Sequence, residues 1–285
     1  MLKVGLFDEE FRHLPNYCGY DQSTKLEWVK DSYEPDILVF TERCYDKVFD
    51  DRAKGKVKCA MPLEPPAIHG YAYSNLKPDL VNMFDYVLTH DDSFALWVKE
   101  NSKATPIFWT PGGSWIWIKD WAIYPKSSNV SIVASAKGWT DGHRFRQQII
   151  DRFSSQFDLI CGYGRKTVEP KVAIFADYRY SVVIENSKYN TYWTDKLIDC
   201  FACGTIPIFW GSPNIGEFFN PDAIISFDTI GDLGEIMGSI GVGDYNNRLP
   251  AVNENFEIAK SKYAIVEEYL ADNVFNKIME ERGLK

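Results

Sequence analysis

The sequence has little that would place this chain in a membrane or on nucleic acid. No stretch approaches the roughly 20 consecutive apolar residues that a membrane-spanning helix needs. Acidic residues outnumber basic ones by 40 to 31, which gives a formal net charge of −9, whereas nucleic-acid-binding proteins usually carry a basic surface. The apolar run at the start is too short for a signal peptide and is followed at once by acidic residues. We therefore predict a soluble, cytoplasmic chain with no integral membrane segment and no nucleic-acid partner.

Metal-ligating and nucleophilic motifs are also scarce. The four histidines are scattered, without the short spacing of metal ligands. Among the six cysteines, Cys200 and Cys203 alone have the CxxC spacing, and no second CxxC accompanies them. The glycine-rich residues 110–114 lack the fingerprints of a P-loop and of a dinucleotide-binding turn. The sequence thus favours buried thiols in a reducing compartment, and it predicts no metal site.

What the sequence does contain is an alternation of short apolar strands and amphipathic segments. The composition is globular, with 45% hydrophobic and 25% charged residues. Strands separated by helix-length segments predict βαβ units and parallel sheets. The first predicted series of strands comprises residues 3–7, 36–40, 57–61, 86–89 and 106–109. After a predicted linker at 126–129, the second series comprises residues 131–135, 158–161, 181–184, 205–210 and 223–227.

Two such series predict an α/β protein with two Rossmann-like, doubly wound domains that face each other across a cleft. We place the first domain at residues 1–126 and the second at 127–254. Residues 255–285 are predicted to form a helix that packs back on the domains. Because ligands bind outside the carboxyl ends of the strands in doubly wound sheets, the loops that directly follow strands are the candidate binding segments.

The most unusual of these loops is ENSKYNTYWTDK, residues 185–196. It is longer than the two to six residues usual for such a connection, and it is rich in aromatic and hydrogen-bonding side chains. Thr194 is the predicted N-cap of a helix that stops at Gly204. Lys196 falls in the first turn, where the helix dipole disfavours a cation. A bound anion such as a phosphate would explain it; the alternative is an ordinary solvated lysine.

A second loop of this kind leads into GWTDGHRFRQQIIDRF, residues 138–153. Arg144 and Arg146 are predicted in the first turn of its helix, again at the end that disfavours cations. Arginine binds phosphate oxygens in a bidentate manner. Together with Lys196, the two arginines predict a diphosphate held between neighbouring loops. The alternative is surface charge paired with nearby aspartates such as Asp141.

Two further loops offer single candidate residues. Glu64 lies between prolines in PLEPP, after the strand at 57–61, and prolines hold the backbone of such a loop rigid. A general base needs a fixed position of this kind; the alternative is a capping or salt-bridging glutamate. Arg165 lies in GYGR after the strand at 158–161, where it either belongs to a plain turn or reaches a ligand.

Three segments together resemble a known protein family. They are YRYSVVIENS at 178–187, YWTDK at 192–196 and GTIPIFWGSP at 204–213. Their order and spacing resemble the donor-binding signature of the α1,3/α1,4-fucosyltransferases, glycosyltransferase family ten. FNPDA at 219–223 continues the match. The resemblance is specific over about residues 130–230 and much vaguer before them.

The resemblance implies a GT-B glycosyltransferase with the nucleotide sugar on its C-terminal domain and the acceptor oligosaccharide on its N-terminal domain. It implies transfer of L-fucose from GDP-β-L-fucose with inversion, an α1,3-type linkage, and no requirement for a divalent metal or other cofactor. It also implies residue roles: Glu64 as the base, Arg146 and Lys196 on the diphosphate, Asn186, Tyr192 and Asp195 on fucose and ribose, and Glu185 as the residue that orients the loop. Arg165 is predicted as a further donor contact from its place after a strand and not from the resemblance.

Two departures from the family leave alternatives open. The family usually has glutamate where this chain has Asp195, which allows another nucleotide sugar as the donor. The sequence also lacks the N-terminal membrane anchor of the Golgi members, so a soluble bacterial- or virus-type enzyme is expected. A non-catalytic glycan-binding protein is a further alternative, since the nine tryptophans and sixteen tyrosines could line a sugar platform.

Overall fold

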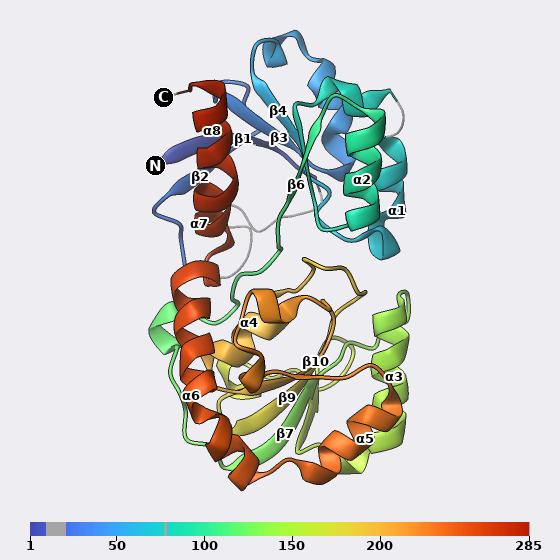
Figure 1. The fold of residues 1–285 in the computed structure, drawn as a ribbon, viewed down its shortest axis with the longest axis vertical. Helices are drawn as coiled ribbons and strands as arrows, with labels where there is room; N and C mark the ends of the chain where they lie inside the picture. Colours follow the sequence, from blue (N-terminus) through green and yellow to red (C-terminus); the bar gives the residue numbers. More distant parts are fainter. Residues whose placement is uncertain (10–20, 77–78, 285) are drawn as a thin grey trace. The chain divides into compact units, whose positions relative to one another are not determined.

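The computed structural model describes residues 1–9, 21–76 and 79–284, and the chain divides into two compact units. Unit 1 comprises Met1–Pro111, Tyr189–Thr191 and Ile265–Lys285, and unit 2 comprises Gly112–Lys188 and Tyr192–Ala264. Each unit has one parallel sheet with helices on both sides (Figure 1). These bounds differ from the predicted domains in two ways. The first segment of unit 1 ends at Pro111 and not at residue 126, and the C-terminal residues Ile265–Lys285 also belong to unit 1.

The sheet of unit 1 has six parallel strands in the order β2-β1-β3-β4-β5-β6. They are β1 (Leu2–Phe7), β2 (Leu26–Lys30), β3 (Ile37–Phe40), β4 (Val57–Ala60), β5 (Tyr86–Thr89) and β6 (Thr105–Phe108). The five strands predicted for this half are confirmed within a residue or so, and β2 is an additional edge strand. The chain order reverses between β1 and β3, which is the point where doubly wound sheets bind ligands.

The helices of unit 1 cover this sheet and complete its core. They are η1 (Glu42–Phe49), η2 (Asp51–Ala53), α1 (Pro66–Asn75), η3 (Leu80–Met83), α2 (Asp92–Asn101), α7 (Val266–Leu270), η10 (Ala271–Phe275) and α8 (Asn276–Arg282). Every residue of β3 and β5 is buried, as expected for strands of a parallel sheet covered on both faces. One core cluster joins Phe7 and Phe40 of the sheet to Tyr45 of η1 and Phe94 of α2.

The sheet of unit 2 has five parallel strands in the order β11-β10-β9-β7-β8. They are β7 (Ser128–Val133), β8 (Leu159–Cys161), β9 (Tyr178–Ile184), β10 (Ile206–Trp210) and β11 (Ile225–Ser226). All five predicted strands of the second series are confirmed, although β7 begins earlier and β11 is shorter than predicted. The chain order reverses between β7 and β9, so the switch point of this unit lies there.

The helices of unit 2 pack on this sheet around a core that includes Ile132, Val182 and Ile208. They are η4 (Ile118–Asp120), α3 (Asp141–Phe153), η5 (Ser154–Gln156), η6 (Lys171–Ile174), α4 (Asp195–Ala202), η7 (Ile215–Glu217), η8 (Pro221–Ala223), α5 (Ile230–Ser239), α6 (Val242–Ile258) and η9 (Ala259–Tyr263). The predicted helix at 255–285 therefore begins inside α6 and continues as several short helices, of which the last three belong to unit 1.

The predicted linker at residues 126–129 is wrong. The Lys126 ammonium group donates hydrogen bonds to the carbonyls of Ala176 (3.0 Å) and Cys203 (2.7 Å) and to the Thr205 hydroxyl (3.0 Å). Burial lowers the pKa of Lys126 to about 8. Because these bonds tie Lys126 to the body of unit 2 and β7 begins at Ser128, the segment is part of the folded unit.

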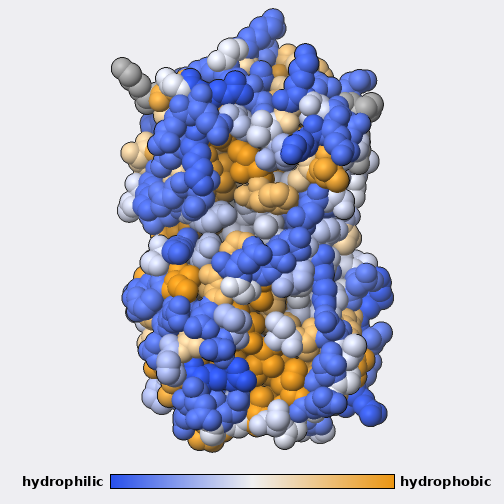
Figure 2. Space-filling view, in the orientation of Figure 1, coloured by the Kyte–Doolittle hydropathy of each residue, from blue (hydrophilic) through white to orange (hydrophobic). Residues whose placement is uncertain are grey.

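Surface and cysteine chemistry agree with a globular protein. Hydrophilic side chains cover most of the face that Figure 2 shows, with apolar side chains in separate patches. Five cysteines are buried free thiols whose pKa values burial raises: Cys44, Cys59, Cys161, Cys200 and Cys203. The sixth, Cys18, lies outside the described residues. Within the described ranges, no helix combines the length and the apolar composition needed to cross a bilayer.

Candidate functional site

Two loops of unit 2 meet at the switch point between β7 and β9. The loop after β7 leads into α3, and the loop after β9 leads into α4. The backbone N–H of Gly142 donates to the carbonyl of Asn186 at 3.2 Å. A Cβ atom at Gly142 would lie 1.9 Å from the carbonyl oxygen of Glu185. Since any side chain would clash there, glycine permits the start of α3 to lie directly against the loop after β9.

A hydrogen-bonded chain of side chains connects these loops. Arg146 of α3 is 2% exposed, and its guanidinium donates to the carbonyl of Ile184 (Nε, 2.9 Å) and to Oδ1 of Asn186 (Nη2, 3.1 Å). The Asn186 amide donates in turn to the Tyr192 hydroxyl at 3.3 Å. Burial lowers the pKa of Arg146, and the nearby Glu185 carboxylate opposes that shift. The structure thus brings together three of the predicted donor-binding residues.

One of the two arginines predicted in the first turn of α3 lies further along the helix. The helix begins at Asp141, and the hydroxyl of its N-cap Thr140 accepts from the His143 N–H at 3.2 Å. Arg146 therefore lies in the second turn, where the dipole argument no longer applies. Arg144 is exposed and pairs with Asp141. The alternative of ordinary surface charge thus describes Arg144, whereas Arg146 is buried at the loop junction.

Glu185 fixes the shape of the loop after β9. Its buried carboxylate accepts from the backbone N–H of Thr194 at 2.8 Å and from the Thr194 hydroxyl at 3.1 and 3.0 Å. A buried carboxylate needs such bonds to offset its lost hydration. Thr194 is the N-cap of α4 as predicted, but its hydroxyl serves Glu185 and makes no cap bond. Glu185 therefore joins the two ends of the loop.

Lys196 is not an ordinary solvated lysine. Its side chain is 21% exposed, and Nζ lies 2.9 Å from Oγ1 of Thr194, 3.6 Å from Oε2 of Glu185 and 3.9 Å from Oδ1 of Asp195. The ammonium group thus lies at the N-terminal end of α4, as predicted. Both carboxylates lie farther from Nζ than the roughly 2.8 Å of a charge-assisted hydrogen bond. The ammonium group can therefore still bind an anion at that shorter distance.

Asp195 belongs to a buried charge network that the sequence did not indicate. Its carboxylate lies 2.6 Å from Nζ of Lys171, which also lies 2.5 Å from the carboxylate of Asp199. Asp199 is buried and accepts from the Ser114 hydroxyl at 2.7 Å. Burial alone would raise the pKa of Asp195, but the ammonium groups of Lys171 and Lys196 outweigh it and hold the pKa at about 2. Asp195 is therefore a fixed, ionised acceptor.

The electrostatic field at His143 is positive. His143 is 4% exposed, and its ring accepts from the Thr140 N–H at 3.3 Å. Burial, reinforced by a group of nearby cations, lowers the pKa of His143 to about 4. These cations are Arg146, Lys137, Lys196 and Arg144. In a chain of net charge −9, such a concentration of cations favours an anionic ligand.

Arg165 lies on the β8 side of the sheet. Its guanidinium donates to Oε1 of Gln147 of α3, and its backbone N–H closes the turn to the carbonyl of Gly162 at 2.9 Å. Beside this turn, the Lys137 ammonium lies 4.9 Å from the ring of Trp139 and 5.7 Å from the ring of Tyr163. Arg165 is thus connected to α3 by its hydrogen bond to Gln147. Among the described residues, no hydrogen bond joins it to Lys196.

Glu64 belongs to unit 1, where a second glutamate holds its loop. Its backbone N–H and that of Leu63 donate to Oε1 of Glu42, at 3.3 and 2.6 Å. The carbonyl of Glu64 accepts from the Tyr73 hydroxyl at 3.1 Å. Glu42 is 1% exposed and lies two residues after the end of β3, at the switch point of unit 1. The rigid loop predicted for Glu64 is present, whereas Glu42 was not predicted because no motif flanks it.

Comparisons with known proteins agree with these observations. A sequence model described as "Glycosyltransferase family 10 (fucosyltransferase) C-term" matches residues 125–247. An alpha-(1,3)-fucosyltransferase, FucT, of Helicobacter pylori is 32% identical over 73 residues, which are 26% of this chain and 15% of that protein. An alpha-(1,4)-fucosyltransferase of Arabidopsis thaliana is 30% identical over 63 residues, which are 22% of this chain and 16% of that protein. The matches thus span less than a fifth of the length of these two relatives.

Solved structures show the fold over nearly the whole chain. A crystal structure of an alpha1,3-fucosyltransferase with GDP-fucose covers 93% of this chain and 92% of its own, with a TM-score of 0.53 and 15% identity. An alpha-glucosyltransferase in complex with UDP and a 13-mer DNA covers 97% and 98%, with a TM-score of 0.56 and 12% identity. At such identities the likeness concerns the fold alone, and it confirms the predicted GT-B architecture of two Rossmann-like domains.

Proposed function

We propose that this chain, whose residues 125–247 match the model of glycosyltransferase family 10, transfers L-fucose from GDP-β-L-fucose to a hydroxyl group of an acceptor glycan. One observation carries the proposal. At the switch point of unit 2, Arg146 and Lys196 both contribute to a positive field at His143, and Arg146 lies beside the fixed polar groups of Asn186 and Tyr192. Cations and amide groups at this edge of a doubly wound sheet suit a nucleotide diphosphate.

In the proposed reaction, Arg146 and Lys196 bind the diphosphate of the donor. Asn186, Tyr192 and the ionised Asp195 form hydrogen bonds with the fucose and ribose hydroxyls, and Arg165 is a further donor contact. Glu64 of unit 1 removes the proton from the acceptor hydroxyl. The acceptor oxygen then attacks the anomeric carbon from the face opposite the diphosphate, so that the configuration is inverted and an α1,3-type linkage forms.

Negative charge develops on GDP as it leaves. Fixed cations aimed at that charge stabilise the transition state more than the ground state. Arg146 is suited to this because its buried position is already set by Ile184 and Asn186, so little reorganisation accompanies the reaction. We propose that these two cations supply the charge and that no divalent metal or other cofactor is required. Cytoplasmic location and the lack of a nucleic-acid partner stay predictions.

Ligand-dependent stability separates this function from its alternatives. We expect GDP and GDP-fucose to raise the unfolding temperature, since a ligand that binds the folded state at about 100 times its Kd adds about 2.7 kcal/mol. A larger shift with UDP would support a GT-B transferase with another donor, which the pairing of Asp195 with Lys171 leaves open. No shift with any nucleotide would favour the glycan-binding alternative. A glycan screen with GDP-fucose, read as GDP release above hydrolysis, then identifies the acceptor.

The pKa of His143 provides a second test of the diphosphate site. We expect GDP binding to raise it from about 4, because the anion offsets the field of Arg146 and Lys196. By linkage, protonated His143 then favours GDP, so affinity increases as the pH falls between the free and bound pKa values. The ring signals of His143 in NMR spectra, titrated with and without GDP and identified with a His143→Gln variant, measure the shift. An unmoved pKa would place the diphosphate elsewhere.

A further inference from the structure

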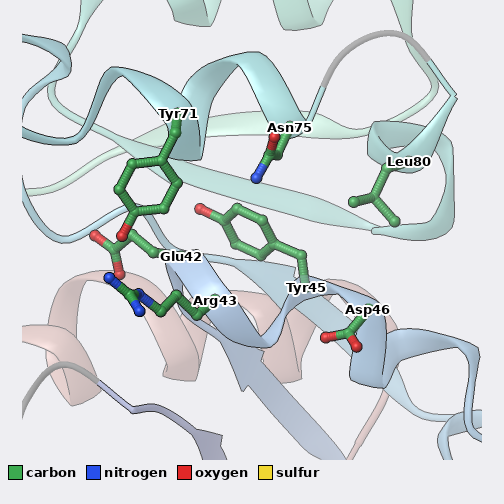
Figure 3. A pocket seen from close by; sticks show the side chains of 7 residues that line it. All are labelled: Glu42, Arg43, Tyr45, Asp46, Tyr71, Asn75 and Leu80. Atoms are coloured by element: carbon green, nitrogen blue, oxygen red, sulfur yellow. The ribbon is translucent and has the colours of Figure 1, made fainter.

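Unit 1 has a pocket of about 610 Å³ between η1 and α1 (Figure 3). This volume is typical of a small-molecule site. Four of its lining residues come from η1 and two from α1: Glu42, Arg43, Tyr45, Asp46, Tyr71 and Asn75. Glu42 also places one wall at the switch point of the sheet, where ligands of such folds bind.

Two buried polar atoms of this pocket have no hydrogen-bond partner within the described residues. They are Oε2 of Glu42, which is 1% exposed, and the hydroxyl of Tyr45, which is 2% exposed. Buried polar atoms are nearly always satisfied in folded proteins, so each exception needs an explanation. Figure 3 shows the Tyr45 hydroxyl directed to the side of the pocket where Glu42 and Tyr71 lie.

The two atoms need opposite partners. A carboxylate oxygen accepts a hydrogen bond and cannot donate one. Burial and the charge of Glu42 raise the pKa of Tyr45 well above its usual value, so the phenol keeps its proton and donates. A hydroxyl group satisfies both, since it can donate to Glu42 and accept from Tyr45.

The charge and the aromatic surface of the pocket lining favour a neutral ring as the ligand. Glu42 and Asp46 carry negative charge against the single guanidinium of Arg43, so the pocket disfavours anions. The ring of Tyr71 is 36% exposed and forms an apolar wall, and the Arg43 guanidinium lies 6.0 Å from its centroid. An aromatic wall with a few convergent polar groups is the usual make-up of a site for a small, partly apolar ligand.

We propose that this pocket binds a neutral sugar ring through Glu42 and Tyr45, with Tyr71 against the ring face. In identifying the ring as part of the acceptor glycan, the inference rests on the proposed function. Glu42 connects the two, because its other oxygen holds the backbone of Leu63 and Glu64. The same carboxylate would thus bind the sugar ring through Oε2 and the loop of the proposed base through Oε1.

Saturation-transfer NMR on the whole protein tests the pocket directly. The probes are methyl β-glucoside, methyl β-galactoside and methyl N-acetyl-β-glucosaminide at millimolar concentration, with saturating GDP present to occupy the nucleotide site. We expect saturation transfer to at least one glycoside, and a weaker response from glucuronate because of its charge. Tyr45→Phe should weaken that binding at least about fivefold, the effect of one hydrogen bond.

Tyr33→Phe is the matched control, since the Tyr33 hydroxyl bonds the carbonyl of Lys47 in the same helix η1 and does not line the pocket. It should leave glycoside binding unchanged. Tyr45→Phe should fold normally, because it removes a buried hydroxyl that has no partner among the residues the structure describes. No saturation transfer from any glycoside, equal effects of the two variants, or a response that GDP abolishes would each overturn the proposal. GDP binding in the same sample reports separately on the proposed function.

Discussion

Replacing Glu64 by glutamine is expected to lower the rate of fucose transfer by about 10²–10⁴-fold, the usual contribution of a general base. The amide keeps the size of the side chain but cannot accept the proton of the acceptor hydroxyl. The loop itself should be unaffected, because Glu42 and Tyr73 hold it through the backbone of Glu64 and its neighbour. Single-turnover transfer to an acceptor from the glycan screen measures the change.

Two measurements separate loss of a base from loss of structure. GDP affinity should be unchanged in Glu64→Gln, because the residues proposed to bind the nucleotide belong to unit 2. Glu34→Gln, which removes an equal charge from an exposed position of unit 1, should transfer fucose at the normal rate. Near-normal transfer by Glu64→Gln would exclude Glu64 as the base, and Glu42 would then be the carboxylate of unit 1 to test next.

The strand pattern could be predicted from the sequence because most strands of this fold are buried on both faces. Such strands are continuous apolar runs bounded by polar turns, as in ILVF of β3 and IPIFW of β10. β2 escaped prediction because LEWVK is an edge strand in which Leu26 and Trp28 alone are buried. The segment 126–129 was wrongly predicted to be a linker because a lysine and two serines are typical of solvated loops. In the structure, the Lys126 ammonium group donates hydrogen bonds inside unit 2.

A residue of the candidate site could be predicted where it departs from a local sequence preference, such as the preference against cations at helix N-termini. Residues that follow these preferences could not be recognised. Lys196 at the start of a helix is such an exception, and the structure places it at the junction of the two loops. Lys171 and Glu42 show no such departure from a local preference. Their partners, Asp195 and Leu63, are more than twenty residues away in the sequence. Pairings of this kind depend on the tertiary fold, which a local pattern does not encode.

Replacing Lys196 by alanine is expected to weaken GDP binding by about 10- to 100-fold, because a charge-assisted hydrogen bond contributes about 1.5–3 kcal/mol. The ammonium group is the cation at the N-terminal end of α4, 3.6 Å from the nearest oxygen of Glu185. Its removal leaves the Glu185–Thr194 bonds intact, so the loop should keep its shape. Titration calorimetry with GDP on the variant and the parent protein measures the loss.

Guanosine makes the test specific to the diphosphate. If Lys196 binds phosphate oxygens, Lys196→Ala loses affinity for GDP but keeps its affinity for guanosine, which has the same base and ribose. Lys188→Ala removes a cation from the same loop that is paired with Asp228, and it should change neither affinity. Equal losses for GDP and guanosine would mean that Lys196 shapes the loop and does not bind the anion. Arg146 alone would then hold the diphosphate, and the positive field at His143 would have to come mainly from α3 and its preceding loop.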